Sequence, residues 1–550
     1  MLSINNIVVN KYKHLCNSLY LIILHLFSSL HWISSKTYDF VIINISHFII
    51  ELCYFILVSS FGFLTLKTLN PKSIHKNDKI NINNPIKDLD LFFTSVSATT
   101  VSSMSTLEME VFSNSQLIVI TILMFIGGEV FTSMIGLHFS ASNLVYKPLK
   151  SRSRVNSVAS LTLPFEPIEL GLIVVTPQEN NTSTPTMQKT KSETDFFIKS
   201  KSIRVLGFLV LLYLFTIHIL GISMVLLYLN ITPNAINVLH KKGIETFTFS
   251  IFTIVSTFAS CGFIPTNENM QVFSKNSGFL LILIPQILLG NTLFPSFLRF
   301  SIWVLGKFAK KDEAKYLLRN AKEIGYHHLL PSKHSRLLIM TVLGFIMVQL
   351  VVFCAMEWSN EGINKGHNVY QKLVGILFQC VNSRHTGESI VDLSSIAPAM
   401  LVVFILMMYL PPYTSFVPIK DEEKEYTHIL CKEEDKRRKI LKNVLFSQLS
   451  HLAIFTIIIC IIEKQNMKDD PLNFNVFNIA FEVISAYGNV GFSTGYSCGK
   501  QLKGDPKCVE KWYGFAGRWS DQGKLALIIV MFFGRLKKFN LKGGKAWKLL

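Results

Sequence analysis

Four short stretches of small residues are the part of this sequence best suited to cation chemistry. Each follows a half-apolar segment; the matching position is glycine in three of them and serine in the first. These positions are Ser102, Gly262, Gly387 and Gly491. A pore that strips water from an ion must supply other oxygens, and backbone carbonyls do so when a loop holds them inward. Glycine suits such a loop because it adopts positive φ without a Cβ clash.

The residues directly before these positions would flank the same filter. They are Val101, Cys261, Thr386 and Val490. A single glycine of this kind is more often a turn or a contact between membrane helices. Four such stretches at corresponding places in the chain favour a shared function instead. A short helix before each stretch would direct its negative C-terminal end towards the ion path, which favours a cation.

The segments that must position these stretches follow one pattern, which occurs four times. A long apolar segment precedes each half-apolar segment, and another long apolar segment follows it. Apolar residues make up 49% of the 550 residues and charged residues 16%. Runs such as Leu117–Phe139 and Val205–Leu229 reach the ~20 residues that a membrane-crossing helix needs. Because a backbone in lipid must satisfy its hydrogen bonds within helices, the sequence predicts an all-α membrane protein built from repeats.

The charge pattern predicts the topology. The formal net charge is +18, and the three linkers that join the repeats are all basic. Basic linkers are expected in the cytosol, so each repeat starts and ends there and its middle segment dips in from outside. The predicted divisions are a cytosolic or peripheral segment 1–47, repeats at 48–145, 205–305, 337–416 and 444–550 (the last with a short cytosolic tail), and cytosolic linkers at 146–204, 306–336 and 417–443. Composition predicts disorder in the first linker, over Thr176–Glu193.

Longer stretches of the chain resemble the plant HKT branch of the Trk/Ktr/HKT cation transporters. The matching stretches are Phe92–Leu117, Ser256–Met270, Val381–Leu393, Met407–Tyr413, Glu482–Cys498 and Met531–Trp547. The resemblance covers nearly all of the chain from about Phe48 onward. It implies an all-α integral membrane fold with four pseudo-symmetric helix–pore-loop–helix repeats around one central cation pore.

The resemblance also implies roles for individual residues. It places Na⁺ at the backbone carbonyls of the four filter positions. In the family, serine at the first position accompanies Na⁺-selective members, called subfamily one, and glycine accompanies members that also carry K⁺. Ser102 therefore implies passive Na⁺ conduction, and the alternative is a K⁺ transporter or Na⁺/K⁺ symporter on the same fold. Arg535 is implied to be an electrostatic barrier in the inner pore, although the sequence alone equally allows a snorkelling cation at a helix end.

Other classes of function find little support in the sequence. A membrane-embedded enzyme is disfavoured, since the chain carries neither H-E-x-x-H nor G-x-S-x-G, and it has no P-loop. We expect no cofactor and, without a recognisable motif, no nucleic-acid partner. The expected partners are Na⁺, with K⁺ as the alternative cargo, the lipid bilayer and, as the resemblance implies, a second copy of the chain. The expected location is the plasma membrane, multi-pass, with both termini cytosolic. Cys498 and Cys508 share one polar loop, where a disulfide is possible but is not determined by the sequence.

Overall fold

The structure is a computed structural model that describes residues 47–72, 86–138, 185–308, 312–364, 366–414, 448–502 and 508–540. The chain forms two compact units, Met1–Leu57 and Val58–Leu550. The described part of the first unit is the beginning of α2, and everything below concerns the second unit. Most of the predicted N-terminal segment, the third predicted linker and the end of the C-terminal tail lie outside the described residues.

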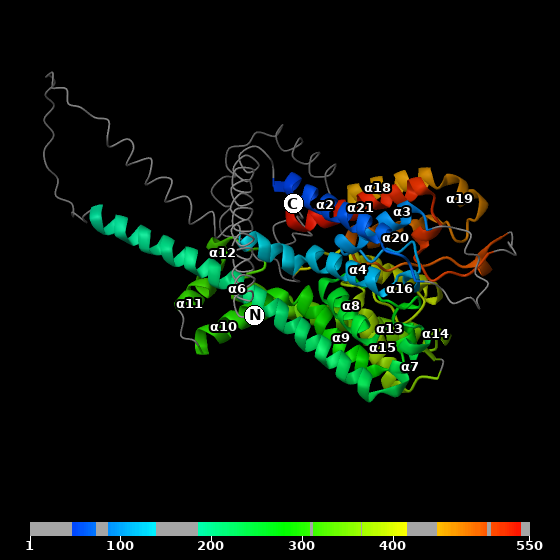
Figure 1. Cartoon of the computed structure of the whole chain (residues 1–550), viewed down its shortest axis with the longest axis horizontal. Helices are drawn as coiled ribbons and strands as arrows, with labels where there is room; N and C mark the ends of the chain where they lie inside the picture. The colour runs from blue at the N-terminus through cyan, green and yellow to red at the C-terminus, as the bar shows by residue number, and fades with distance from the viewer. Residues whose placement is uncertain are drawn as a thin grey trace, which may run out of the picture. The chain divides into compact units, whose positions relative to one another are not determined.

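The described secondary structure is entirely helical (Figure 1). The first two repeats contain α2 (His47–Thr68), α3 (Asp88–Thr99), α4 (Asn114–Gly127), a helix at Glu129–His138, α6 (Pro185–Ile231), α7 (Pro233–Lys241), α8 (Thr246–Ala259), α9 (Ser277–Gly290) and α10 (Phe294–Phe308). The linker helices α11 (Asp312–Arg319) and α12 (Ala321–Ile324) follow. The last two repeats contain α13 (Ser332–Glu357), α14 (Glu361–Asn364), α15 (Val369–Asn382), α16 (Pro398–Tyr409), α18 (Gln448–Ile462), α19 (Lys464–Asp469), α20 (Val476–Gly488) and α21 (Asp521–Asn540). Short 3₁₀ turns lie at Met109–Val111, Asn269–Phe273, Leu393–Ser395, Cys498–Lys500 and Phe515–Arg518.

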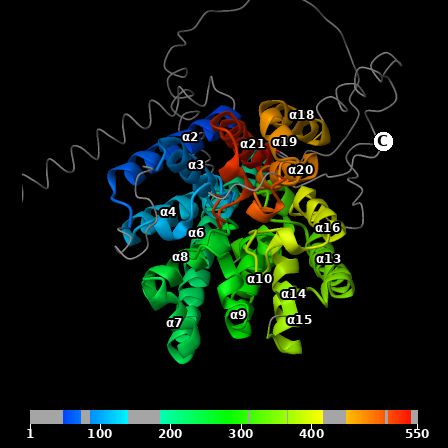
Figure 2. The same cartoon turned by 90° about the vertical axis from the view of Figure 1, so that its right-hand side faces the viewer.

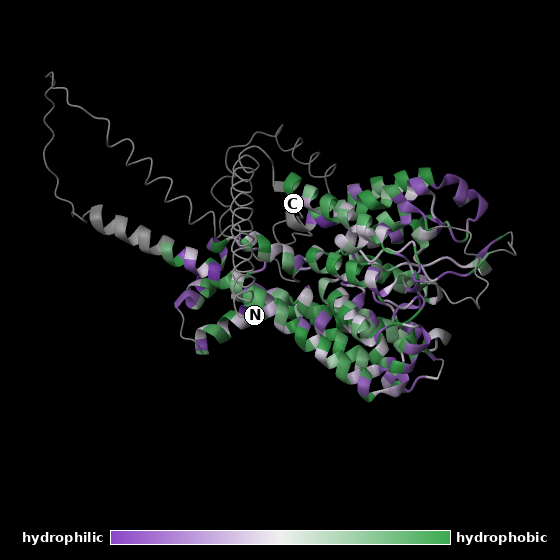
Figure 3. Cartoon of the chain, viewed as in Figure 1, coloured by the Kyte–Doolittle hydropathy of each residue, from purple (hydrophilic) through white to green (hydrophobic). Residues whose placement is uncertain are grey.

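Apolar composition determines where the long helices form. Within the described residues, parts of α2 and α6 and all of α13 are long and apolar enough to cross a membrane. Large apolar side chains remain exposed on these helices, for example Leu212 and Met340, as expected for surfaces that face lipid. Figure 3 shows that hydrophobic residues extend along most of the length of α13 and α18.

Two of the predicted apolar segments are bent rather than straight. The segment predicted at Leu117–Phe139 bends by 55° between α4 and the helix that begins at Glu129. The segment predicted at Gly278–Leu305 bends by 82° between α9 and α10. Each bend begins at glycine, Gly127 or Gly290, where hydrophobicity alone gave no reason to expect a break. α6 begins at Pro185, within the stretch Thr176–Glu193, and residues 176–184 of that stretch lie outside the described residues.

The shorter helices α3, α8, α15 and α20 precede the four filter stretches, and we call them the pore helices. α8, α15 and α20 each pack against the inner helix of the preceding repeat, namely α4, α9 and α16. α3 packs in the same way against α21, the inner helix of the last repeat. Figure 2 shows α3–α4, α8–α9, α15–α16 and α20–α21 following one another in chain order around a common centre. The second unit is therefore a closed ring of four repeats.

Glycines let the inner helices approach the ends of the pore helices. A Cβ on Gly127, Gly290 or Gly534 would lie 2.0, 2.0 or 2.2 Å from the carbonyl oxygen of Thr99, Phe258 or Tyr487, respectively. A real carbon cannot come this close, so any other residue would push the inner helix away. Each of these carbonyls belongs to the last turn of a pore helix, or to its last residue. The close approach places the helix breaks at Gly127 and Gly290 directly behind the filter stretches.

Candidate functional site

The chain leaves three of the pore helices in the same way. The backbone N–H groups of Ser102, Cys261 and Val490 each donate to a carbonyl five residues earlier, at 2.8, 2.9 and 3.0 Å. In each case the residues on either side have positive φ. These pairs are Val101 and Ser103 (50° and 54°), Ser260 and Gly262 (63° and 83°), and Asn489 and Gly491 (50° and 97°). In the third repeat Gly387 has φ 68°. The same turn therefore ends in Ser103, Gly262 and Gly491.

Contacts between repeats close these turns into a ring. A Cβ on Gly262 would lie 1.6 Å from the Thr386 carbonyl oxygen. A Cβ on Gly387 would lie 2.3 Å from the Val490 carbonyl oxygen. A Cβ on Gly491 would lie 2.9 Å from the Ser102 carbonyl oxygen and 2.1 Å from Ser103 Cβ. Each glycine thus faces the carbonyl that precedes the matching position of the next repeat.

This pattern makes Ser103, rather than Ser102, the structural counterpart of the three glycines. Ser103 has positive φ, as the glycines do, and its Cβ is the atom that Gly491 approaches. It also lies four residues after Thr99, just as Gly262 follows Phe258 and Gly491 follows Tyr487. The sequence placed the first position at Ser102 because two adjacent serines cannot be told apart by residue type. The backbone separates them, since only Ser103 has positive φ.

Ser102 occupies a different environment, behind the ring. Its side chain is fully buried, and its Oγ lies 2.7 Å from Thr100 Oγ1. Asn489 Nδ2 donates to Ser102 Oγ at 2.7 Å and to the carbonyl of Met531 at 3.3 Å. Asn489 begins the fourth filter stretch, so this contact fastens the first stretch to the fourth. Sequence reasoning assigned no role to the Asn489 side chain.

A hollow of about 410 Å³ opens above the ring. Ser103, Gly262, Gly387 and Gly491 all line it. Its wall also carries carboxylates and the aromatic side chains of Tyr496, Trp512 and Tyr513; the acidic residues are Glu108, Glu268, Asp392, Glu482 and Glu510. Among the described residues that line the hollow, Lys511 is the one lysine or arginine, so the wall has a net negative formal charge, which favours cations near the ring.

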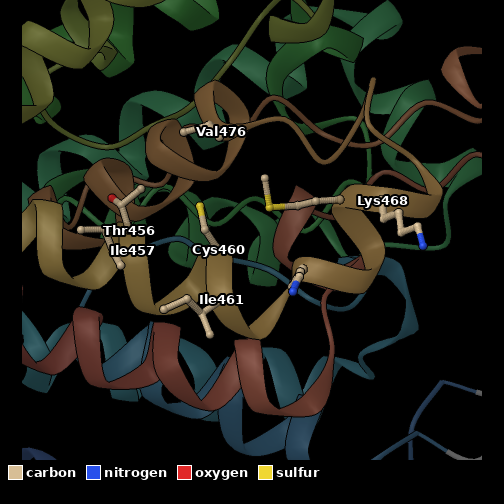
Figure 4. A pocket seen from close by; sticks show the side chains of 8 residues that line it. Thr456, Ile457, Cys460, Ile461, Lys468 and Val476 are labelled. Atoms are coloured by element: carbon tan, nitrogen blue, oxygen red, sulfur yellow. The ribbon is translucent and has the colours of Figure 1, made fainter.

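A second, larger hollow of about 610 Å³ lies over α18 and α19 (Figure 4). Most of its wall is apolar, with side chains such as Ile457, Ile461 and Val476. Lys464 and Lys468 supply positive charge. A wall of this composition offers a cation few oxygens, so the hollow above the ring is the candidate site.

Ion pairs hold the wall of the hollow in place. Lys511 Nζ lies 3.1 Å from Glu108 Oε2, and Lys242 Nζ lies 2.5 Å from both Glu110 Oε1 and Glu268 Oε2. Burial acts to lower the pKa of Lys242, but the two carboxylates outweigh it and raise that pKa above its ordinary value. Lys242 therefore stays charged and joins the first repeat to the second.

A disulfide lies beside the part of the wall that Ser497 and Glu510 form. Cys498 and Cys508 are joined, with their Cα atoms 5.9 Å apart. Glu510 Oε1 accepts from the backbone N–H of Cys498 at 2.8 Å and from Ser497 Oγ at 3.2 Å. The pairing that the sequence left open is thus present, and it positions Glu510 in the wall.

Two buried arginines donate to carbonyls at or just beyond the ends of inner helices. Arg535 is only 1% exposed, and its guanidinium donates to the carbonyl of Gly127 at the end of α4. Arg384, three residues before Gly387, donates to the carbonyls of Pro411 and Pro412 at 2.6 and 3.3 Å. Arg384 thereby connects the third filter stretch to the segment that follows α16. The guanidinium of Arg535 is enclosed by protein, unlike that of a cation that snorkels to the membrane surface.

Comparisons with known proteins agree with this architecture. The sequence matches the TrkH family, described as cation transport protein, over residues 172–541. It is 48% identical over 504 residues to "Cation transporter HKT1;3" of Oryza sativa subsp. japonica, covering 91% of both chains. It is 49% identical over 470 residues to "Sodium transporter HKT1" of Arabidopsis thaliana, covering 84% of this chain and 89% of that one.

The potassium transporter TrkH from Vibrio parahaemolyticus is a solved structure with 16% identity and a TM-score of 0.47, covering 90% of this chain and 83% of that one. The family match and the plant relatives also separate the chain from enzymes. The chain is a cation transporter of the TrkH family and belongs to its plant HKT branch.

Proposed function

We propose that this transporter conducts Na⁺ passively through a filter formed by the carbonyls of Ser103, Gly262, Gly387 and Gly491. The residues just before them, Ser102 (in place of Val101), Cys261, Thr386 and Val490, then flank the filter. This arrangement shifts the first position by one residue from the one that the sequence favoured.

The main support for the proposal is that Ser103 brings a side chain into a ring whose other three positions are glycines. Glycine is required at three of the positions, because a Cβ there would overlap the next repeat. Ser103 adopts positive φ while keeping its Cβ and hydroxyl. Its Oγ would lie 3.3 Å from a Cβ on Gly262 and 2.8 Å from a Cβ on Gly491. The serine thus narrows the ring on one side, which disfavours K⁺, the larger and more weakly hydrated ion.

The experiment compares two neighbouring serines. Ser103→Gly and Ser102→Gly are expressed in oocytes, and reversal potentials are measured while external Na⁺ and K⁺ are exchanged. We expect Ser103→Gly to admit K⁺. Ser102→Gly removes the bond to Asn489 but no side chain from the ring, so it should change the preference for Na⁺ less. A K⁺ current in Ser102→Gly alone would return the first filter position to Ser102. A wild-type reversal potential that follows K⁺ alone would support the alternative, a K⁺ transporter or Na⁺/K⁺ symporter.

Arg535 completes the proposed pathway as an electrostatic barrier below the filter. Its burial, and its bond to a carbonyl at the break after α4, support this role. We further propose that the protein lies in the plasma membrane as a multi-pass homodimer, with both termini cytosolic and repeats bounded as predicted. The basic linkers support the orientation, and the family resemblance supports the dimer.

A further inference from the structure

Glu388 is a buried carboxylate directly after the third filter glycine. Its side chain has no solvent exposure. Its neighbours Gly387 and Ser389 both line the hollow above the ring, whereas Glu388 does not. Glu388 is directed away from the hollow, since its carboxylate instead meets Thr257 of α8.

One oxygen of Glu388 bonds to the second repeat. Thr257 Oγ1 donates to Glu388 Oε1 at 2.6 Å, a short but ordinary length for an O–H···O hydrogen bond. Thr257 lies in the last turn of α8, and its carbonyl accepts from the N–H of Ser260, where the second filter stretch begins. The contact therefore spans two repeats at the height of the filter.

The residue after Glu388 is also hydrogen-bonded to the second repeat. The N–H of Met270 donates to the carbonyl of Ser389 at 3.1 Å, and Asn269 Oδ1 accepts from the N–H of Ser389 at 3.4 Å. The N–H of Ile390 donates to Gln379 Oε1 at 3.1 Å. Met270 and Asn269 lie beyond the end of α8, whereas the bond of Glu388 ends on α8 itself.

The second oxygen of Glu388 has no hydrogen-bond partner among the described residues. None of the ion pairs formed within the described part of the chain includes Glu388. A buried carboxylate without a protein counter-charge is costly, and within membrane proteins such groups accompany ion pathways. A cation held in the adjacent filter would offset this charge.

We propose that Glu388 is a positioning residue for cation selection, which fixes the third filter stretch against α8 and supplies negative charge behind the ring. This inference rests on the proposed conduction of Na⁺. Two separable effects follow. The hydrogen bond to Thr257 sets the distance between the second and third stretches, and hence the Na⁺/K⁺ preference. The charge strengthens cation binding, and hence sets the Na⁺ concentration at which current saturates.

The experiment uses the full chain in oocytes, with surface expression measured for each variant. Glu388→Gln keeps the shape and one acceptor but removes the charge. We expect the Na⁺ concentration for half-maximal current to rise on the order of threefold to tenfold, with the maximal current changed less. Thr257→Val removes the donor but leaves the carboxylate. We expect this variant to change the Na⁺/K⁺ permeability ratio on the order of threefold to tenfold, which corresponds to the free energy of one hydrogen bond.

Thr253→Val is the matched control. Thr253 lies one turn earlier on α8, is fully buried, and its hydroxyl makes no hydrogen bond within the described residues. It should leave both the half-saturating concentration and the permeability ratio at their wild-type values. The double variant Glu388→Gln, Thr257→Val should change the permeability ratio no more than Thr257→Val alone, because both act through one contact.

The outcomes distinguish this inference from the function beneath it. Wild-type protein at the surface without Na⁺ current would defeat the proposed function. Wild-type Na⁺ current with Glu388→Gln unchanged in half-saturating concentration would defeat only the role of the charge. Equal shifts of the permeability ratio in Thr257→Val and Thr253→Val would show that any valine in α8 disturbs the filter, and would overturn the positioning role.

Discussion

Replacing Gly262 by alanine should abolish selective conduction while leaving the rest of the fold intact. The new Cβ would lie 1.6 Å from the Thr386 carbonyl oxygen, whereas an ordinary contact begins near 3.4 Å. The two stretches must therefore separate by roughly 1.8 Å. A filter that replaces water with carbonyl oxygens depends on ion–oxygen distances, so a shift of this size removes ligands from the ion.

Gly495→Ala isolates this steric effect. Gly495 also has positive φ, at 64°, but a Cβ there would meet no atom within 4 Å. Both substitutions share the cost of placing alanine in the left-handed region, about 1–2 kcal/mol. Any further loss in Gly262→Ala comes from the collision with Thr386.

The assay is voltage clamp with external Na⁺ and K⁺ exchanged, normalised to protein at the cell surface. Gly495→Ala should keep at least half of the wild-type current, since about 1–2 kcal/mol is a fraction of typical protein stability. Gly262→Ala should reach the surface and carry no selective current. Wild-type selectivity in Gly262→Ala would refute the argument that these repeats meet too closely for a Cβ.

Two further predictions concern the inner and outer ends of the pathway. Arg535→Ala should increase inward current or alter rectification at unchanged surface expression, because removing a buried cation lowers an electrostatic barrier; unchanged current–voltage curves would contradict the barrier role. Replacing Cys498 and Cys508 together by serine should lower the free energy of unfolding by roughly 2–3 kcal/mol, given the short loop that they close. Thermal unfolding of detergent-purified protein measures this loss, and a melting temperature equal to the wild type would argue against a stabilising disulfide.

The sequence was sufficient to predict the helical repeats and to single out three glycines that the structure packs against the next repeat. Gly262, Gly387 and Gly491 stand out because glycine alone tolerates both the backbone conformation and the close approach of the next repeat. The first proposed position moves from Ser102 to Ser103, which the sequence could not separate because the two residues have the same side chain. Only the backbone conformation distinguishes the residue that faces the hollow from the residue behind it.

The helix breaks were not predicted for a related reason. Hydropathy reports whether a residue prefers lipid, and Gly127 and Gly290 both lie within apolar runs. The bends arise because each glycine packs against the carbonyl of a pore helix far away in sequence. Asn489 and Thr257 were overlooked likewise, since each acts on a residue of another repeat. A contact of this kind leaves no local pattern in the chain.

Two hydrogen bonds between neighbouring repeats break the four-fold symmetry of the ring. Behind the ring, Asn489 fastens the fourth stretch to the first, and Glu388 receives a hydrogen bond from the second repeat into the third. The two bonds lie on opposite sides of the ring, since the repeats follow one another in chain order. The first bond adjoins Ser103, where the ring is narrowed by a side chain, and the second brings a carboxylate beside Gly387. Steric restriction on one side and negative charge on the other would together favour a small ion of high charge density over a larger ion of the same charge, which a ring of four equivalent glycines would not do.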